Sequence, residues 1–350
     1  MATTLYRLND PLAVRVWAKK LFQEALKATA FRPFIGDSTS SIIQMKNELT
    51  KSAGSRITVG LRMQLVGSGV SGDSTLEGNE EALQTYADDL YIDQLRHAVK
   101  NAGRMSDQRI TFSVREEARV ALVDWWSNRY DTVIANQLAG NTLETDLKYT
   151  GNNATVAFDS SHVVYGGGGT SEADVASKGA SAKFTLDLID KCITKAKTLT
   201  PTVRPIRHNG KDCYAIFLHP FQVRDLRTST ATGQWLDIQK SAMSGGDVSK
   251  NPIFTGALGM YNNTYIYEQV RMPEVVSTVR RAVFCGAQAG IMAFGRHNSS
   301  PLSMNFVEES FDFGNQYGVS AGNIFGMKKT RFNSQDFGTI VVPTYAVENP

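Results

Sequence analysis

The sequence has few of the residues from which enzymes build metal and redox sites. Its 350 residues include only 3 cysteines, Cys192, Cys213 and Cys285, whose irregular spacing is not that of a zinc site or a disulfide framework. The 5 histidines occur in no His-Glu-x-x-His motif. We therefore expect no catalytic residue, no metal and no cofactor, and we expect the cysteines to be small buried side chains.

The sequence also has no long apolar run and little excess of one charge. No run approaches the ~20 residues that cross a bilayer, and no signal peptide is evident, so we expect a soluble protein made in the cytoplasm without a membrane partner. The formal charge of +3 is too small for a dedicated nucleic-acid binder, although it permits non-specific proximity to nucleic acid. With 42% hydrophobic and 20% charged residues, the chain is globular.

The most strongly patterned stretch is residues 55–93. Between residues 57 and 65 every odd position is apolar and every even position is polar or glycine, which predicts a half-buried strand. A glycine-rich tip follows at residues 66–81, and the chain can return through residues 82–93. The simplest interpretation is a long β-hairpin, which is marginal alone in water.

The charge of this predicted hairpin is one-sided. Between Met63 and Leu95 there is no Lys or Arg, but there are seven carboxylates: Asp73, Glu77, Glu80, Glu81, Asp88, Asp89 and Asp93. Basic residues follow directly: Arg96, Lys100, Arg104, Arg109, Arg115 and Arg119. An apolar ribbon with open edges needs cover. We expect the tip acids Asp73, Glu77, Glu80 and Glu81 to contact Arg96, Arg104, Arg109 and Arg115 of a neighbouring copy.

The same tip contains an alternative signal. Gly67, Gly69 and Gly72 fit the glycine pattern of dinucleotide-binding proteins and follow a predicted strand, which leaves open a nucleotide-binding enzyme. Against it, the strand alternates where a buried parallel strand would be apolar on both faces, and the following segment lacks the apolar stripe of a packed helix. A carboxylate at Asp73 also disfavours a bound pyrophosphate.

The rest of the chain indicates an α+β protein. Ser113 opens a predicted helix over residues 114–139 that Gly140 closes, and residues 141–182 are irregular. Other predicted helices cover residues 10–27, 91–102, 186–196, 220–227 and 234–243. Predicted strands cover residues 41–46, 214–218, 264–268, 282–285, 290–294, 328–332 and 339–345.

Several sequence blocks resemble the major capsid proteins of the N-four-like bacteriophage family. The blocks are LRMQLVGSGV (61–70), LEGNEEAL (76–83), IDQLRHAV (92–99), Gln108-Arg109, Leu218-His219-Pro220, NPIFTGALG (251–259) and GMKK (326–329). Residues 141–182 match poorly, so nothing is transferred to them.

The resemblance implies a Hong Kong ninety-seven-like capsid fold. Its parts would be an N-terminal arm (1–54), an extended loop (55–93), a peripheral domain (94–182 and 301–350) with a spine helix (114–139), and an axial domain (183–300). The implied function is a non-enzymatic shell protein. It would form hexamers and pentamers of an icosahedral virion assembled in the bacterial host, with packaged double-stranded DNA and portal, scaffolding and cement proteins as candidate partners.

Two further expectations come with the resemblance. The type member of this fold crosslinks its shell through an extended-loop lysine, and no lysine lies between Met63 and Leu95, so that isopeptide bond is not available. Encapsulin-type shells, which enclose cargo enzymes, are similar in fold and remain an alternative function.

Overall fold

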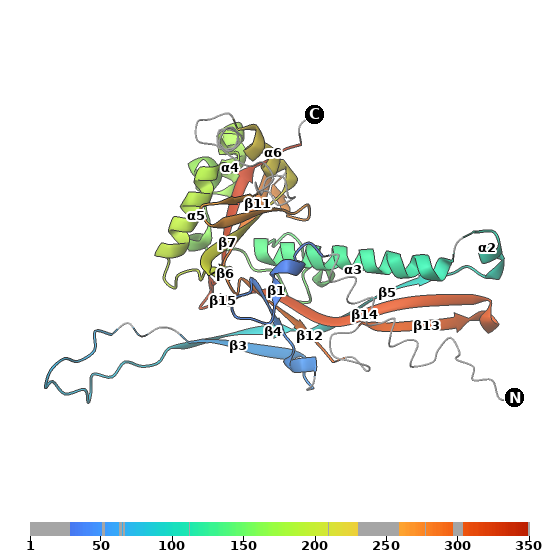
Figure 1. Cartoon of the computed structure of the whole chain (residues 1–350), viewed down its shortest axis with the longest axis horizontal. Helices are drawn as coiled ribbons and strands as arrows, with labels where there is room; N and C mark the ends of the chain where they lie inside the picture. Colours follow the sequence, from blue (N-terminus) through green and yellow to red (C-terminus); the bar gives the residue numbers. More distant parts are fainter. Residues whose placement is uncertain are drawn as a thin grey trace.

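The computed structural model describes residues 29–50, 53–62, 65, 67–111, 113–208, 210–229, 259–276, 278–296 and 304–348. Within these ranges the chain forms two units, each built on one large sheet, and a long loop projects from the lower unit (Figure 1). The helices expected over 10–27 and 234–243 lie outside the described residues.

The lower unit is organised around the long strand β14 (Gln316–Lys329). One after another, three strands pair antiparallel with it: β13 (Asn305–Phe311), β5 (Asp93–Lys100) and β12 (Gly290–Phe294). Parallel pairing then extends the sheet from β12 to β2 (Ile43–Lys46) and the short β1 (Ile35–Gly36). The strand expected at residues 41–46 is therefore confirmed.

Helix α3 (Val114–Ala139) packs along this sheet, as predicted (Figure 1). The Ser113 hydroxyl accepts a hydrogen bond from the backbone N–H of Glu116, and Gly140 ends the helix at φ 61°, a left-handed conformation that glycine adopts without strain. Trp126 and Tyr130 are fully buried, and each such side chain removed from water contributes ~1.5–3 kcal/mol.

In the described residues, the upper unit contains a seven-stranded sheet and three helices. Its strands are β6 (Ile206–His208), β7 (Lys211–Leu218), β8 (Gly259–Tyr261), β9 (Thr264–Glu268), β10 (Glu274–Val276), β11 (Val279–Cys285) and β17 (Thr339–Tyr345). Its helices are α4 (Glu172–Lys178), α5 (Leu186–Thr198) and α6 (Pro220–Thr228). The amphipathic α5 buries Leu186, Ile189 and Ile193 in this unit's core.

All three cysteines are free and buried, as expected. Burial raises the pKa of the Cys192 thiol to about 12, so this side chain stays a neutral apolar group at physiological pH.

Arg281 joins the upper unit to the end of α3. Arg281 on β11 donates to the carbonyl oxygens of Ala139 (3.1 Å) and Gly140 (2.7 Å) at the end of α3. Its other edge forms a bidentate ion pair with Glu172 of α4, at 2.6 and 2.9 Å. A cation at a helix C-terminus is favourable because the exposed carbonyl groups there carry partial negative charge.

One secondary-structure prediction was wrong. Residues 91–102 were expected to form a short helix, but Asp93–Lys100 is strand β5, paired with β14 from Asp93–Phe325 to Lys100–Gly318. In β5, Leu95, His97 and Val99 lie on one face. The His97 ring stacks on the Trp125 ring of α3, with 4.5 Å between the ring centroids. Pairing and packing with distant residues overrode the local helix preference.

Sheet membership crosses the domain boundaries expected from the sequence. Strand β12, expected in the axial domain, lies in the lower sheet, and β17, expected in the peripheral domain, lies in the upper sheet. The irregular region at residues 141–182 contains α4 and short 3-10 turns. Its glycine turn Gly166–Gly168 packs closely, because a Cβ on Gly166 would lie 2.5 Å from the Ala182 carbonyl oxygen.

Candidate functional site

The predicted hairpin is present, and its strands form only its base. Strand β3 (Arg56–Arg62) pairs antiparallel with β4 (Thr85–Tyr91), from Arg56 opposite Tyr91 to Arg62 opposite Thr85. Ile57 and Leu90 are buried in a small cluster against the lower sheet. Residues 67–84 contain neither helix nor strand and extend away from both units at the left of Figure 1.

The projecting loop leaves large apolar side chains in solvent. Leu65, Leu76 and Leu83 are 57%, 62% and 58% exposed. Burying a leucine contributes ~1.5–3 kcal/mol, and a single subunit does not make this gain at any of the three positions. Exposed apolar side chains on a long protrusion mark a surface that another molecule covers.

Two loop carboxylates hold the shape of the loop. A Glu81 carboxylate oxygen accepts the backbone N–H of Gly67 at 2.7 Å, across the two limbs, and Glu80 accepts the N–H of Gly78 at 2.8 Å. Three glycines in the loop have left-handed φ angles, which permit its sharp turns: Gly69, Gly72 and Gly78. Asp73 and Glu77 at the tip are exposed.

The base of the loop is tied to its own subunit by charge. Lys328 on β14 forms an ion pair with Asp88 and donates to the Asp89 carbonyl oxygen at 2.9 Å. Asp89 also lies 3.1 Å from the Arg56 guanidinium and accepts the Thr58 hydroxyl at 2.6 Å. The sequence shows these two carboxylates only as part of a one-sided charge, but in the folded subunit each lies beside a basic side chain.

The basic residues expected to receive the loop lie on three different elements. Arg96 is exposed on β5, Arg104 is exposed on α2 (Arg104–Gln108), and Arg109 is exposed just after it. Arg115, in contrast, forms a bidentate ion pair with the buried Glu308 at 2.8 and 3.0 Å. In one subunit, α2 and the acidic loop lie at opposite ends (Figure 1), so a subunit cannot bring them together by itself.

No nucleotide-binding element follows the glycine motif. A dinucleotide site needs a strand, a tight glycine turn and then a helix. Here residues 67–72 are exposed loop, the Gly67 N–H is used by Glu81, and no helix follows in the described residues 67–84. The nucleotide-binding alternative is therefore wrong.

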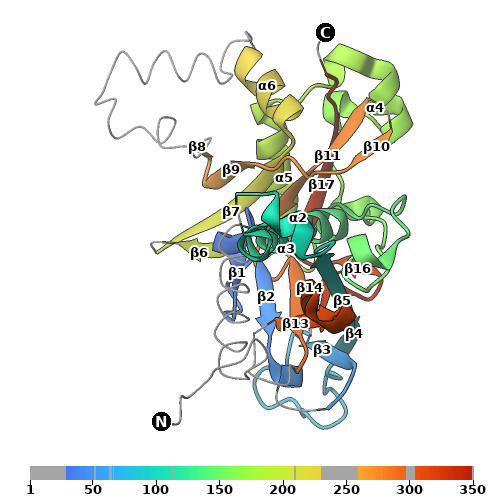
Figure 2. The same cartoon turned by 90° about the vertical axis from the view of Figure 1, so that its right-hand side faces the viewer.

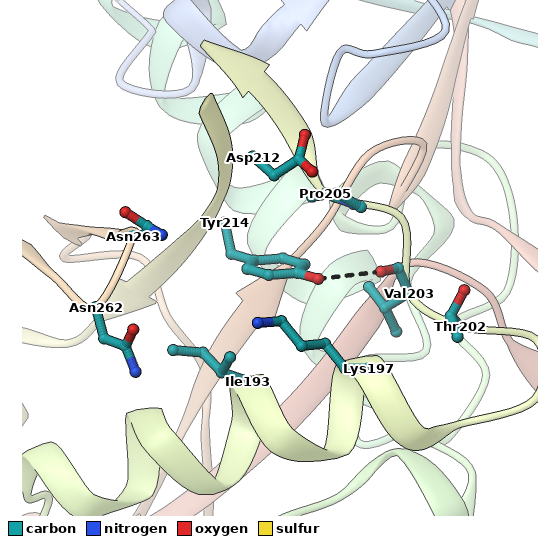
Figure 3. Close-up of a pocket in the computed structure, with 9 residues that line it drawn as sticks. All are labelled: Ile193, Lys197, Thr202, Val203, Pro205, Asp212, Tyr214, Asn262 and Asn263. Atoms are coloured by element: carbon teal, nitrogen blue, oxygen red, sulfur yellow. Dashed lines mark hydrogen bonds between the residues drawn. The ribbon is translucent and has the colours of Figure 1, made fainter. Parts of the chain in front are cut away.

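A cavity of about 330 Å³ lies in the upper unit beside α5 and β7 (Figure 3). The Tyr214 hydroxyl at its wall donates to the Val203 carbonyl oxygen at 3.3 Å, while Lys197, Asn262 and Asn263 are exposed at its rim. In the described part of the chain, no three His, Cys, Asp or Glu side chains are grouped as metal ligands. Among the described helices, none has the length and apolar character that crossing a bilayer requires.

Comparison with known proteins connects this architecture to viral shells. A family model described as phage capsid protein matches residues 6–348. The major capsid protein of Pseudomonas phage KPP25 is 29% identical, with 93% of each chain covered. The capsid of Ralstonia phage GP4 is 35% identical with a TM-score of 0.78 over the whole of both chains. The capsid of cyanophage Pam1 is 20% identical with a TM-score of 0.75, covering 93% of this chain and 94% of that one.

These structures confirm the α+β, Hong Kong ninety-seven-like capsid fold expected from the sequence. The relatives are structural proteins of phage shells rather than enzymes. The chain therefore belongs to the phage capsid protein family, and its function is that of a major capsid protein.

Proposed function

We propose that this chain assembles as hexamers and pentamers into the icosahedral head of a tailed bacteriophage of the N-four-like group. The head encloses double-stranded DNA, which the shell contacts non-specifically, and it is assembled in the bacterial host cytoplasm. Portal, scaffolding and cement proteins are the other candidate partners, and the chain itself has no catalytic role.

The observation that carries the proposal is the uncovered extended loop. Leu65, Leu76 and Leu83 are each more than half exposed, while the base of the loop is held by Lys328. A loop with a fixed base and exposed apolar side chains can extend over a second subunit and bury these side chains there. Exposed ion pairs contribute only ~0–1 kcal/mol each, so the leucines supply most of the affinity and the charges supply register and partner choice.

The residues proposed for this interface follow from their environments. Asp73 and Glu77 are the tip acids best placed to meet a neighbour, because Glu80 and Glu81 also hold turns of the loop. Arg96, Arg104 and Arg109 remain as candidate receivers on the neighbouring subunit. Arg115 forms an ion pair with Glu308 of its own chain, so it is not among the proposed receivers.

Assembly of the purified protein tests the proposal. Wild-type protein should form closed particles of megadalton size by light scattering and electron microscopy. The double variant Leu76→Ser/Leu83→Ser should stay as small, folded species with unchanged circular dichroism. Leu143→Ser is a matched control, since Leu143 is 65% exposed but lies outside the loop, and this variant should assemble normally.

Three outcomes separate the alternatives. A wild-type protein that stays a 38.4 kDa monomer at every concentration contradicts the shell function. Normal particle formation by the double leucine variant would show that the loop leucines are not needed for assembly. Particles isolated from infected cells should contain nuclease-protected DNA, whereas enclosed enzymes without DNA would favour an encapsulin-like cargo shell.

A further inference from the structure

The hairpin that joins β13 to β14 ends in an unusual turn. Three consecutive residues have left-handed backbone angles: Asp312 with φ 50°, Phe313 with φ 48° and Gly314 with φ 84°. Glycine adopts this region freely and aspartate tolerates it, but a bulky aromatic residue there is a genuine outlier. Strained residues of this kind are found preferentially at functional sites.

The strained residue is also completely exposed. Phe313 has 110% of the reference accessible area of its residue type, the largest value among the exposed large hydrophobic residues in the described ranges. The turn therefore holds an aromatic ring away from its own subunit while accepting an unfavourable backbone conformation. Neither feature stabilises the isolated chain, so both point to a contact outside it.

The neighbouring helix α2 makes the turn rigid. The Arg104 side chain donates to the Gly314 carbonyl oxygen at 3.2 Å, and the Arg104 backbone N–H donates to Asn315 at 3.3 Å. Asn315 in turn donates from its side chain to the Asp312 carboxylate at 3.1 Å. Because the ring is presented from a fixed turn, little conformational entropy is lost when it is buried.

The surroundings of Phe313 are apolar at the centre and mixed in charge at the edge. Met105 on α2 is 66% exposed, and Phe311 is partly exposed beneath the Lys100 ammonium group, 4.5 Å from its ring centroid. The exposed charged residues on the same tip carry both signs: Lys100, Arg104, Arg109, Glu309 and Asp312. A surface with an aromatic anchor and both charges is complementary to another protein surface of mixed charge.

We propose that Phe313 is an anchor residue that inserts into an apolar recess on a second copy of this chain. This inference rests on the proposed shell function, because it names a second contact used in the same assembly. The turn between β13 and β14 and the extended loop lie at opposite ends of the lower unit (Figure 1), and Figure 2 views the molecule from the end that carries α2. With a contact surface at each end, one subunit can bind one neighbour through its extended loop and another through this tip, which also carries Arg104 and Arg109.

The charge pattern favours another copy over a nucleic acid or a membrane. The tip carries Glu309 and Asp312 beside its arginines, so it lacks the continuous basic surface that phosphate groups attract. A copy of this chain offers the same mixture of signs. The anchor residue is then expected to account for much of the contact energy, as central aromatic residues do in other protein interfaces.

Substitution of Phe313 tests this role through two measurements, the critical concentration for assembly and the urea midpoint of the unassembled subunit. The proposal predicts a change in the first without a loss in the second. Phe313→Asn removes the ring and places a residue that tolerates left-handed angles. The critical concentration for assembly should rise at least tenfold, while the urea midpoint of the unassembled subunit should be equal to or higher than that of the wild type. Phe313→Tyr keeps the ring and should assemble within about threefold of the wild type.

The control variant is Val270→Asn. Val270 is 63% exposed but lies in the upper unit, so this change should leave assembly unaltered. Normal assembly of Phe313→Asn overturns the inference while the shell function stands, and so does a lower urea midpoint that accounts for the assembly defect. A wild-type chain that forms no particle counts against the proposed function itself.

Discussion

Lys328 on β14 and Asp88 on β4 form an ion pair that joins the main sheet of the lower unit to the base of the extended loop. The Lys328 side chain is 22% exposed and that of Asp88 is 14% exposed, so the pair is partly shielded from water. The backbone N–H of Arg331 donates to the second Asp88 carboxylate oxygen at 3.3 Å. The direction in which the loop leaves the subunit is therefore set by contacts within one chain.

Removing the Lys328 ammonium group should loosen the loop base. Lys328→Met keeps the length of the side chain but leaves Asp88 without its cation and the Asp89 carbonyl oxygen without its donor. We expect the unfolding free energy of the unassembled subunit to fall by about 1–3 kcal/mol, the cost of leaving a shielded polar group without its partner. Urea titration measures this loss, and hydrogen exchange should become faster across β4.

The control for this variant is a solvent-exposed ion pair. Lys148 lies 3.7 Å from Asp146, and the two side chains are 67% and 44% exposed. Lys148→Met should change stability by less than about 1 kcal/mol, as for other surface pairs. Equal effects from both variants would show that the Lys328 contact has no special part in holding the loop.

A glycine next to this ion pair makes a second prediction. A Cβ on Gly326 of β14 would lie 2.1 Å from the Tyr91 carbonyl oxygen, at the end of β4. Gly326→Ala should push β4 away from the sheet, destabilise the subunit by about 1–3 kcal/mol as overpacking does, and lower the yield of shells. Thermal unfolding and particle counts by electron microscopy give the two readouts.

Gly318 on the same strand provides the matched control. A Cβ there would meet the Phe311 ring at 3.1 Å, and this partly exposed ring can move aside. Gly318→Ala should therefore be tolerated. If Gly318→Ala and Gly326→Ala are equally destabilising, the loss of glycine from the strand, rather than the contact with Tyr91, is the cause.

Elements with local signals were predictable from the sequence. The bounds of α3 follow from Ser113, Gly140 and the apolar stripe between them, and β9, β12 and β17 lie at the expected residues. The protruding loop was also predictable, because an alternating strand runs into a glycine-rich acidic segment. Each of these signals lies within the element itself, so no distant partner is needed to recognise it.

Features that depend on distant partners were not predictable. Strand β5 was taken for a helix because its pairing with β14 joins residues more than 200 positions apart. Lys328 and Asp88 are 240 positions apart, and Arg115 and Glu308 are 193 apart. Nothing in the local sequence shows that these charges are already paired, so Asp88 was counted in the one-sided charge of the hairpin and Arg115 was expected in the intersubunit contact.

The loop composition predicts a shell without covalent crosslinks through the loop. An isopeptide bond in which the loop provides the amine needs a loop lysine, and none occurs between Met63 and Leu95. Particles boiled in detergent should dissociate completely and migrate as one band near 38.4 kDa. A ladder of covalent multimers would contradict this expectation, and mass spectrometry of its crosslinked peptides would identify the residues joined.

Acid should weaken the subunit through His219, which begins α6. Its Nδ1 accepts the backbone N–H of Phe221 at 3.2 Å, and this requires a neutral ring. Burial, followed by the positive charge of Arg280, lowers the pKa of His219 from 6.5 to about 4. In the unfolded chain His219 therefore binds a proton below pH 6.5. In the folded chain it binds this proton only near pH 4. The stabilisation is complete above pH 6.5 and is lost as pH falls toward 4.

His219→Ser separates the titration from the helix cap. Serine is a good N-cap residue, so the variant should retain α6 at pH 7.5. Between pH 7.5 and 4.5 the unfolding free energy of the wild-type subunit should fall by about 1–3 kcal/mol more than that of the variant, measured by urea titration of unassembled protein. Burial also lowers the pKa of His162, but that residue is present in both proteins and cancels in the comparison. Parallel pH profiles would exclude His219 as the source of the acid sensitivity.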